Sequence, residues 1–199
     1  MPAIIEALAR LDGRPFPSID TFGRFLRSGG FLSHGGRGTA APHATPDDVA
    51  NLVIGIMATD SPTAAPRVVD TFRALVRLPE PEPEGVTRAL GLLIRLPSFG
   101  EFLAGAFDYA GTLRRELGDS GIELQISRTV PAAGLLLRDA SGRRRMIAQW
   151  VVDVRRHGAR ASVAGAEAGE DRRLTAAISQ RTIFALGDLL ARDTVEVDR

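Results

Sequence analysis

Arginine is the residue type of this sequence that most clearly points to a binding function, because all 25 basic residues are arginine and none is lysine. A guanidinium group donates paired hydrogen bonds to phosphate oxygens or to a guanine edge, which suits it to nucleic-acid contacts. Near the N-terminus, polar residues on one side of an expected helix are followed by a Gly/Arg segment. We expect DNA contacts from Ser18, Thr21, Arg24, Arg27, His34 and Arg37. The alternatives are a solvated helix face, a flexible connector and, for the lysine-free composition, a GC-rich genome.

A second group of arginines lies where a β-hairpin is expected. Arg143, Arg144 and Arg145 follow a turn sequence at 139–142. Between residues 128 and 173 there are ten arginines against five acidic residues, which is a local surplus of five positive charges. Such a ribbon could contact a nucleic-acid backbone, and we count these three arginines among the DNA-binding candidates. The alternative is a charged sheet edge that prevents aggregation.

No pattern in the sequence indicates catalysis. The absence of cysteine excludes disulfides, thiolate metal sites and cysteine nucleophiles. His34, His43 and His157 lie in expected loops or at a strand end, and their spacing does not place two ligands on one helix face. The glycines at 35–38 lack the spacing of a Walker or dinucleotide loop. We therefore expect a non-enzyme without a cofactor or a metal, and a deep polar pocket would be needed to revive an enzymatic alternative.

Helices are the elements expected to position the first arginine group. Apolar spacing predicts a helix over 3–11 and a second over 19–28, with Ser18 as its N-cap and Gly29 or Gly30 as a left-handed C-cap. The sequence Thr-Pro-Asp-Asp at 45–48 predicts the start of a third helix, because threonine caps, proline fits the first turn and the carboxylates face the positive helix end. A further amphipathic helix is predicted from the apolar residues at 68–76.

The second half of the chain has a different pattern. Acidic residues alternate with proline over 79–85 and predict an extended linker. Two helices are expected over 86–95 and 98–117, and apolar alternation then predicts three antiparallel strands, with Met146 and Trp150 on the same inward face. A last helix is expected to open at Asp171, with an apolar stripe wide enough to contact a second subunit.

Residues 18–56, taken in order, resemble the winged helix-turn-helix of MerR-like regulators. The resemblance is carried by the polar helix, the apolar closure Gly30-Phe31-Leu32, the Arg-containing loop and the capped helix that leads to Val49 and Leu52. It implies that Thr21, Arg24 and Arg27 face the major groove and that His34 and Arg37 approach phosphate or the minor groove from a wing. Pro62 and Pro66 depart from the family pattern, because they interrupt the position of a long dimerisation helix. The style of the chain is also similar to that of prophage DNA-binding proteins.

These observations predict an α+β fold: a mostly helical N-terminal winged helix-turn-helix, then helices, a three-stranded antiparallel meander and a C-terminal helix. The expected regions are 1–78 for DNA binding, a linker over 79–85, and a module over 86–199 for oligomerisation or partner binding. The net charge of +1 excludes a globally basic binder, so phosphate contacts must come from local patches.

We expect a sequence-specific, double-stranded DNA-binding protein, a transcriptional regulator of a phage or mobile element. The alternatives are a small terminase-like packaging subunit, or an interaction module or inhibitor that binds a host or phage protein without nucleic acid. A homo-oligomer, first of all a dimer, is expected through the C-terminal helix. Neither a basic leader nor an apolar run of membrane-spanning length is visible, so we expect a cytoplasmic protein without a membrane partner.

Overall fold

The structure is a computed structural model, and it describes residues 1–33, 43–79, 83–153 and 175–195. Residues 193–195 are described by their backbone only. Within these ranges it is an α+β fold of eight α-helices, one 3₁₀ helix and a five-stranded antiparallel sheet. The helices are α1 (Pro2–Asp12), α2 (Phe16–Ser28), α3 (Pro46–Ala58), η2 (Pro62–Ala64), α4 (Ala65–Arg73), α5 (Arg88–Leu93), α6 (Phe99–Asp108), α7 (Ala110–Leu117) and α10 (Gln180–Val195). The strands are β1 (Val76–Arg77), β2 (Gly121–Ser127), β3 (Ala132–Arg138), β4 (Arg144–Val151) and β5 (Thr175–Ser179).

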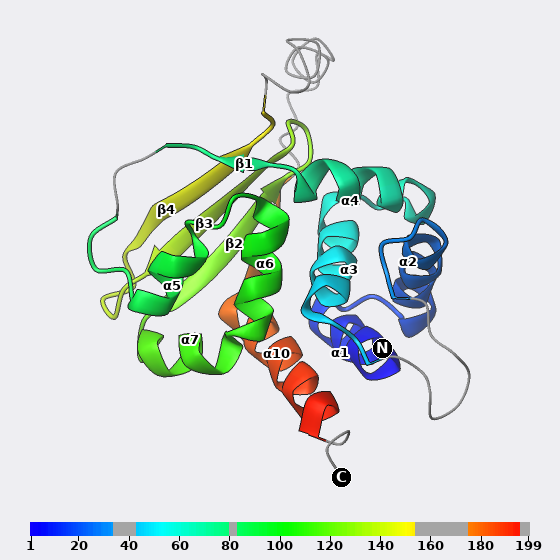
Figure 1. Ribbon diagram of the computed structural model, residues 1–199, viewed down its shortest axis with the longest axis horizontal. Helices are drawn as coiled ribbons and strands as arrows, with labels where there is room; N and C mark the ends of the chain where they lie inside the picture. Colours follow the sequence, from blue (N-terminus) through cyan, green and yellow to red (C-terminus); the bar gives the residue numbers. More distant parts are fainter. Residues whose placement is uncertain (34–42, 80–82, 154–174, 196–199) are drawn as a thin grey trace.

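Helix α3 is the centre of the N-terminal helical region. Every residue of α3 from Asp48 to Ala58 is buried, and the helix packs against α2, α4 and α6 (Figure 1). The predicted capping box is confirmed: the Thr45 hydroxyl accepts from the Asp48 amide at 3.1 Å, and the Asp48 carboxylate accepts from the Thr45 amide at 2.9 Å. An element buried on all sides cannot contact DNA, so any DNA contact from this region must come from the exposed faces of the other helices, among which α2 carries the predicted candidates.

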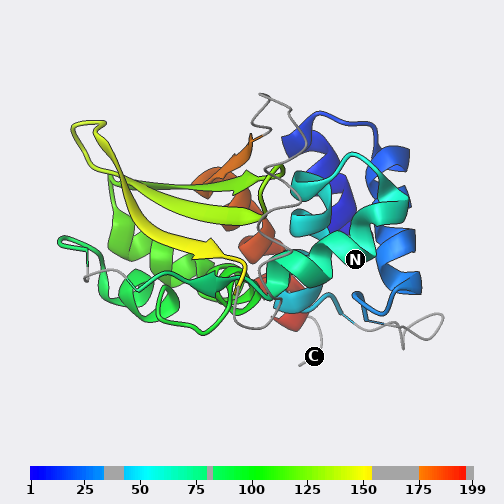
Figure 2. The ribbon, with the colours of Figure 1, turned by 90° about the horizontal axis from the view of Figure 1, so that it is seen from above.

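The sheet has the strand order β1-β4-β3-β2-β5, with every neighbouring pair antiparallel. Helices α5, α6, α7 and α10 lie on one face (Figures 1 and 2), and the apolar strand residues Leu124, Leu135 and Trp150 point into that layer. The opposite face is crossed by no helix of the described residues (Figure 2). We call it the open face, and it carries Glu123, Gln125 and other partly exposed side chains.

One hydrophobic core joins the helical region to the sheet. Trp150 of β4 packs against Phe99 and Phe102 of α6, with ring centroids 5.5 and 4.5 Å apart. Helix α6 also packs on α3 and α4, and α10 contacts both α1 and α7. The buried residues of both regions therefore belong to one cluster. The predicted division into regions 1–78 and 86–199 stays a prediction.

Four expected elements differ in the structure, and one of them is the helix expected over 98–117, which is divided at Tyr109 into α6 and α7. The sheet has five strands where three were expected, since β1 and β5 extend it at both edges. The amphipathic residues 68–76 do not form one helix, because α4 ends at Arg73 and Val76 then pairs with Val151 as an edge strand. The final helix does not open at Asp171, since residues 175–179 form β5 and α10 begins at Gln180.

Met146 was also expected on the wrong face. A β-bulge shifts the register between Leu135 and Leu136, so Ile147 and Ala148 of β4 are both buried. Beyond the bulge the alternation is reversed, and Met146 is 40% exposed. Strict alternation along β4 could not reveal the extra residue.

Candidate nucleic-acid interface

Helix α2 presents the first group of candidate residues. Its apolar face packs Ile19, Phe22 and Leu26 into the core, while Ser18 and Arg24 are exposed on the other side. Thr21 and Arg27 are half-buried. The helix therefore has the amphipathic form that a groove-binding helix requires, with the candidate side chains away from the core.

Ser18 is not the N-cap of this helix. The helix begins at Phe16 with Pro15 as the N-cap, and no side chain caps its first amides. Proline fits the first turn because its missing N–H has no partner there in any case, and Pro17 occupies such a position. The left-handed residue after the helix is Gly30, at φ 79°, as predicted.

Arg24 is held by its neighbours on α2. Its guanidinium donates to the Thr21 hydroxyl at 3.2 Å and lies 3.3 Å from the Asp20 carboxylate. The Thr21 hydroxyl in turn donates to the Pro17 carbonyl at 2.7 Å. The Arg24 side chain remains 65% exposed. These contacts use the Nε and one Nη atom of Arg24 and orient its guanidinium on the helix.

A buried carboxylate joins the two ends of the Gly/Arg segment to α3. Asp48 is 3% exposed, and its oxygens accept from the Ser33 amide at 2.7 Å, the Ser33 hydroxyl at 2.9 Å, and the Thr45 amide and hydroxyl at 2.9 Å each. We call this set of contacts the Asp48 clamp. Ser33 and Thr45 lie on either side of residues 34–42 in the chain, so the clamp holds the described residues before and after that range to the start of α3.

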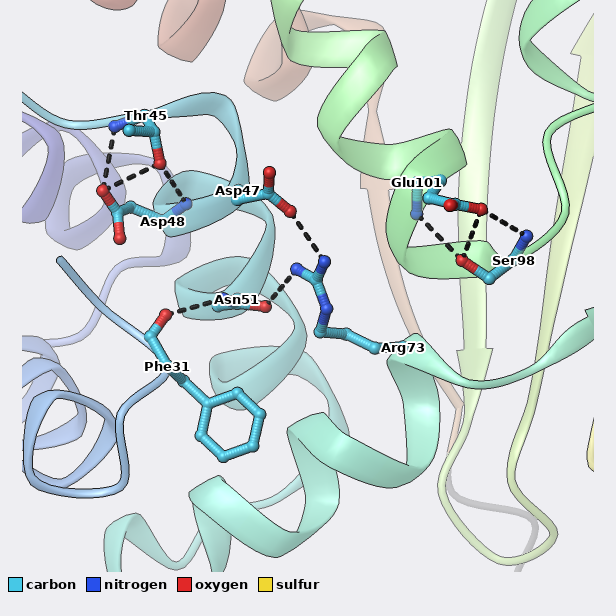
Figure 3. Close-up of polar contacts among 8 residues, drawn as sticks. All are labelled: Phe31, Thr45, Asp47, Asp48, Asn51, Arg73, Ser98 and Glu101. Atoms are coloured by element: carbon cyan, nitrogen blue, oxygen red, sulfur yellow. Dashed lines mark hydrogen bonds and ion pairs between the residues drawn. The ribbon is translucent and has the colours of Figure 1, made fainter.

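A second buried polar side chain supports the clamp from below (Figure 3). Asn51, one turn further along α3, donates to the Phe31 carbonyl at 2.6 Å and accepts from Arg73 at 2.7 Å. Arg73 also binds Asp47 at 2.7 Å. The chain from Phe31 to Ser33 is therefore tied to α3 by two side chains, and α3 is tied to α4 by a third. A separate capping box, in which Ser98 and Glu101 bond each other's backbone amides, begins α6 (Figure 3).

The other candidate residues fall into two sets. His34 and Arg37 lie outside the described residues. The hairpin arginines are described: Arg143 is exposed, Arg144 lies 3.3 Å from Glu123, and Arg145 donates to the Glu84 carbonyl. The last contact ties β4 to the segment before α5, so Arg145 has an internal structural partner.

The structure does not bring the two arginine groups together. The β3–β4 turn that precedes Arg143 lies at one end of the molecule, and α2 lies at the other, in both ribbon views (Figures 1 and 2). Arg24 and the hairpin therefore do not form one continuous cationic face.

The described residues offer no metal centre and no membrane span. They contain no group of three or more His, Asp or Glu side chains that could hold a metal ion. Likewise, none of the helices within the described ranges has both the length and the apolar character needed to cross a bilayer.

Sequence reasoning found the cap at Thr45 but missed the rest of the clamp. Ser33 and Asn51 are single polar residues at no informative spacing, and only the fold brings them to Asp48, Phe31 and Arg73. It also missed that Arg181 of α10 lies beside Arg138 and Arg144 of the expected basic hairpin, because the fold brings these residues together from separate elements. Comparison with known proteins finds no match, since no family model, no curated protein and no solved structure is significantly similar to this chain.

Proposed function

We propose that this protein binds double-stranded DNA sequence-specifically through the exposed face of α2 and the adjoining residues 34–42, as a transcriptional regulator of a phage or mobile element. DNA packaging by a small terminase-like subunit is the alternative that would use the same surface. The observation that supports the proposal is the Asp48 clamp. In the clamp, one buried carboxylate accepts four hydrogen bonds from Ser33 and Thr45, which flank residues 34–42 in the sequence. That range contains Arg37 and follows the helix that carries Arg24.

The clamp also offers a physical reason for specific binding. A contact to a base edge requires the side chain to be held in place before the complex forms, because each freedom lost on binding lowers the affinity. Asp20 and Thr21 hold the Arg24 guanidinium on α2. Fixed ends for residues 34–42 similarly reduce the ordering cost of any contact made by Arg37.

The test is selection of a duplex from a random library, followed by mobility-shift titration of variants. Arg24→Ala should weaken binding about tenfold and relax the selected sequence, as expected for a base contact. Arg37→Ala should weaken binding to all duplexes and lower the slope of log affinity against log salt by about one, as expected for a phosphate contact. Arg192→Ala, an exposed arginine on α10, is the control. Equal affinity of all four proteins would exclude this surface.

A second candidate function is a protein interaction module. The separation of the two arginine groups favours it, as does an apolar groove of about 460 Å³ between α5, α6 and α7. Leu92 and Tyr109 line this groove and are 59% and 52% exposed. Exposed apolar grooves of this kind are typical of sites for protein partners. Failure of the protein to retain any duplex at low salt would favour this function over DNA binding.

A further inference from the structure

Three arginines line a hollow of about 280 Å³ on the open face of the sheet. Arg138 is the last residue of β3, Arg144 is the first residue of β4, and Arg181 lies in the first turn of α10. Glu123 and Gln180 complete the polar lining. We call this site the arginine hollow. None of its lining residues comes from helices α1 to α4, so it is distinct from the α2 surface.

The sheet register places two of these positive charges against each other. Arg138 and Arg144 are directly opposite partners in the β3–β4 ladder, so their side chains leave the sheet on the same face. Like charges in directly opposite positions destabilise a sheet. Glu123 lies 3.3 Å from Arg144 and offsets one charge. Within the described residues, no carboxylate is within ion-pair distance of Arg138 or Arg181, and three positive charges face one negative charge.

The backbone beneath the hollow leaves room for the arginine side chains. A Cβ atom on Gly121 would lie 3.2 Å from the Nε of Arg138 and 2.7 Å from the Oε1 of Gln180. The absence of a side chain at Gly121 thus allows the Arg138 guanidinium to lie across β2. Gln180 accepts from the Ile122 amide at 2.8 Å, which fixes its side chain at the hollow, and its NH₂ group can donate to an anion. The positive end of the α10 dipole adds to the same charge.

We propose that the arginine hollow binds a phosphate group. Guanidinium groups make bidentate hydrogen bonds to phosphate oxygens, and a dianionic ligand would neutralise the surplus that Arg138, Arg144 and Arg181 create. The phosphate could belong to a polynucleotide backbone or to a small phosphorylated compound, and both present the same oxygens. The proposal does not depend on DNA binding by α2.

The experiment uses inorganic pyrophosphate as the probe and thermal unfolding as the readout. Pyrophosphate should raise the Tm of the whole protein above that in sodium chloride of equal ionic strength, because a ligand that binds the folded state stabilises it. Arg138→Gln and Arg181→Gln should each weaken the apparent affinity roughly tenfold or more. Arg192→Gln removes the same charge from the far end of α10 and should leave the affinity unchanged. Without pyrophosphate, Arg138→Gln should raise the Tm, because it relieves the repulsion of Arg144.

Competition then identifies the source of the phosphate. A short duplex that displaces pyrophosphate from the parent protein, but not from an Arg138→Gln variant, would assign the hollow to a polynucleotide backbone. Saturated pyrophosphate that no duplex displaces would assign it to a small phosphorylated compound. An equal Tm rise in all variants, or no rise above the chloride control, would overturn the proposal. Arg24→Ala should not change pyrophosphate binding, so this failure and failure of the α2 proposal can be told apart.

Discussion

Arginine is used differently in the helical region and at the open face of the sheet. In the helical region, Arg14 between α1 and α2, Arg24 of α2 and Arg73 of α4 each lie beside an acidic residue, at Asp12, Asp20 and Asp47. In the arginine hollow, Arg138 faces Arg144, and one carboxylate serves the group. The difference teaches that a near-neutral chain can still hold a concentrated positive site, because neutralisation depends on which residues the fold brings together.

The same comparison separates structural from ligand-binding arginines. Arg73 reaches both Asn51 and Asp47 and so connects α4 to α3, which gives it a role in the fold. Arg138 and Arg181 make no such connection within the described residues. The balance of charges around an arginine is therefore a better guide to its role than its position in a basic sequence run.

The largest expected effect comes from breaking the helical side of the comparison. Asp48→Ala should lower the free energy of unfolding by about 2–4 kcal/mol, because it removes the carboxylate half of the capping box and leaves the Ser33 and Thr45 amides without their acceptor. Urea unfolding followed by circular dichroism measures this loss.

The neighbouring residue supplies the matched control. Asp47 is 61% exposed and pairs with Arg73 at the surface, so Asp47→Ala should cost at most about 1 kcal/mol. Similar losses for the two variants would contradict the role assigned to the Asp48 clamp.

A smaller effect should come from the helix that connects the two regions. A Cβ atom on Gly187 of α10 would lie 2.3 Å from the Cβ of Ala110 and 2.7 Å from the Phe107 carbonyl oxygen. Gly187→Ala should therefore destabilise the protein by about 1–3 kcal/mol through overpacking. Trp150, the single tryptophan, reports the sheet by fluorescence, while circular dichroism reports mainly the helices.

The two signals also test how far the regions are independent. If they form one cooperative unit, both transitions shift together in Gly187→Ala; two separate midpoints would show that helical region and sheet unfold on their own. Gly91→Ala is the control, because a Cβ there meets no atom within 4 Å, and alanine should stabilise α5 by up to about 1 kcal/mol.

The smallest effect concerns the carboxylate nearest in sequence to Arg138. The Ser141 hydroxyl donates to Asp139 at 2.6 Å and, with the Arg143 amide at 3.0 Å, holds the pKa of that carboxyl below its ordinary value. A lowered pKa means that the contribution to stability is complete above about pH 4, the range of an ordinary aspartate, and is lost as the pH falls through the lowered value. Amide chemical shifts of Gly142 and Arg143 should follow this titration, and Asp139→Asn should abolish it. A titration at or above the ordinary aspartate pKa would contradict the turn geometry.

Local patterns in the sequence predicted the parts of this fold that depend on neighbouring residues. The cap at Thr45 and the glycine at Gly30 follow from spacing alone, as do the apolar faces of α1 and α2 except for Leu11 and Phe25, which are 44% and 38% exposed. Strands β1 and β5 could not be predicted in this way, because Val76 lies in an apparent helical pattern and Ile178 in an expected helix. Both become strands only because a sheet edge is available to pair with them, which is a tertiary effect.

The candidate sites show the same limit. Arg24 was identified because it lies on a recognisable amphipathic helix. Asn51 and Arg181 are single polar residues, and only the fold brings Asn51 to Phe31 and Arg73, and Arg181 to the hollow that Arg138 and Arg144 also line. The C-terminal helix shows a related limit. Ile183 and Leu186 of its apolar stripe are buried in this chain's own core, whereas Phe184 is only partly buried, and the subunit contact expected from the stripe stays a prediction. An apolar stripe indicates that a helix face is buried, but it does not say whether the face packs on the same chain or on a second subunit.

The bulge at Ile147 has a consequence for the chemistry that β4 can display. Trp150 and Arg144 are six positions apart, and an even separation in a regular strand puts both side chains on one side. The inserted residue changes this parity. The indole of Trp150 therefore lies in the hydrophobic core, whereas the guanidinium of Arg144 on the same strand lies at the surface, where it can bind an anion from solution.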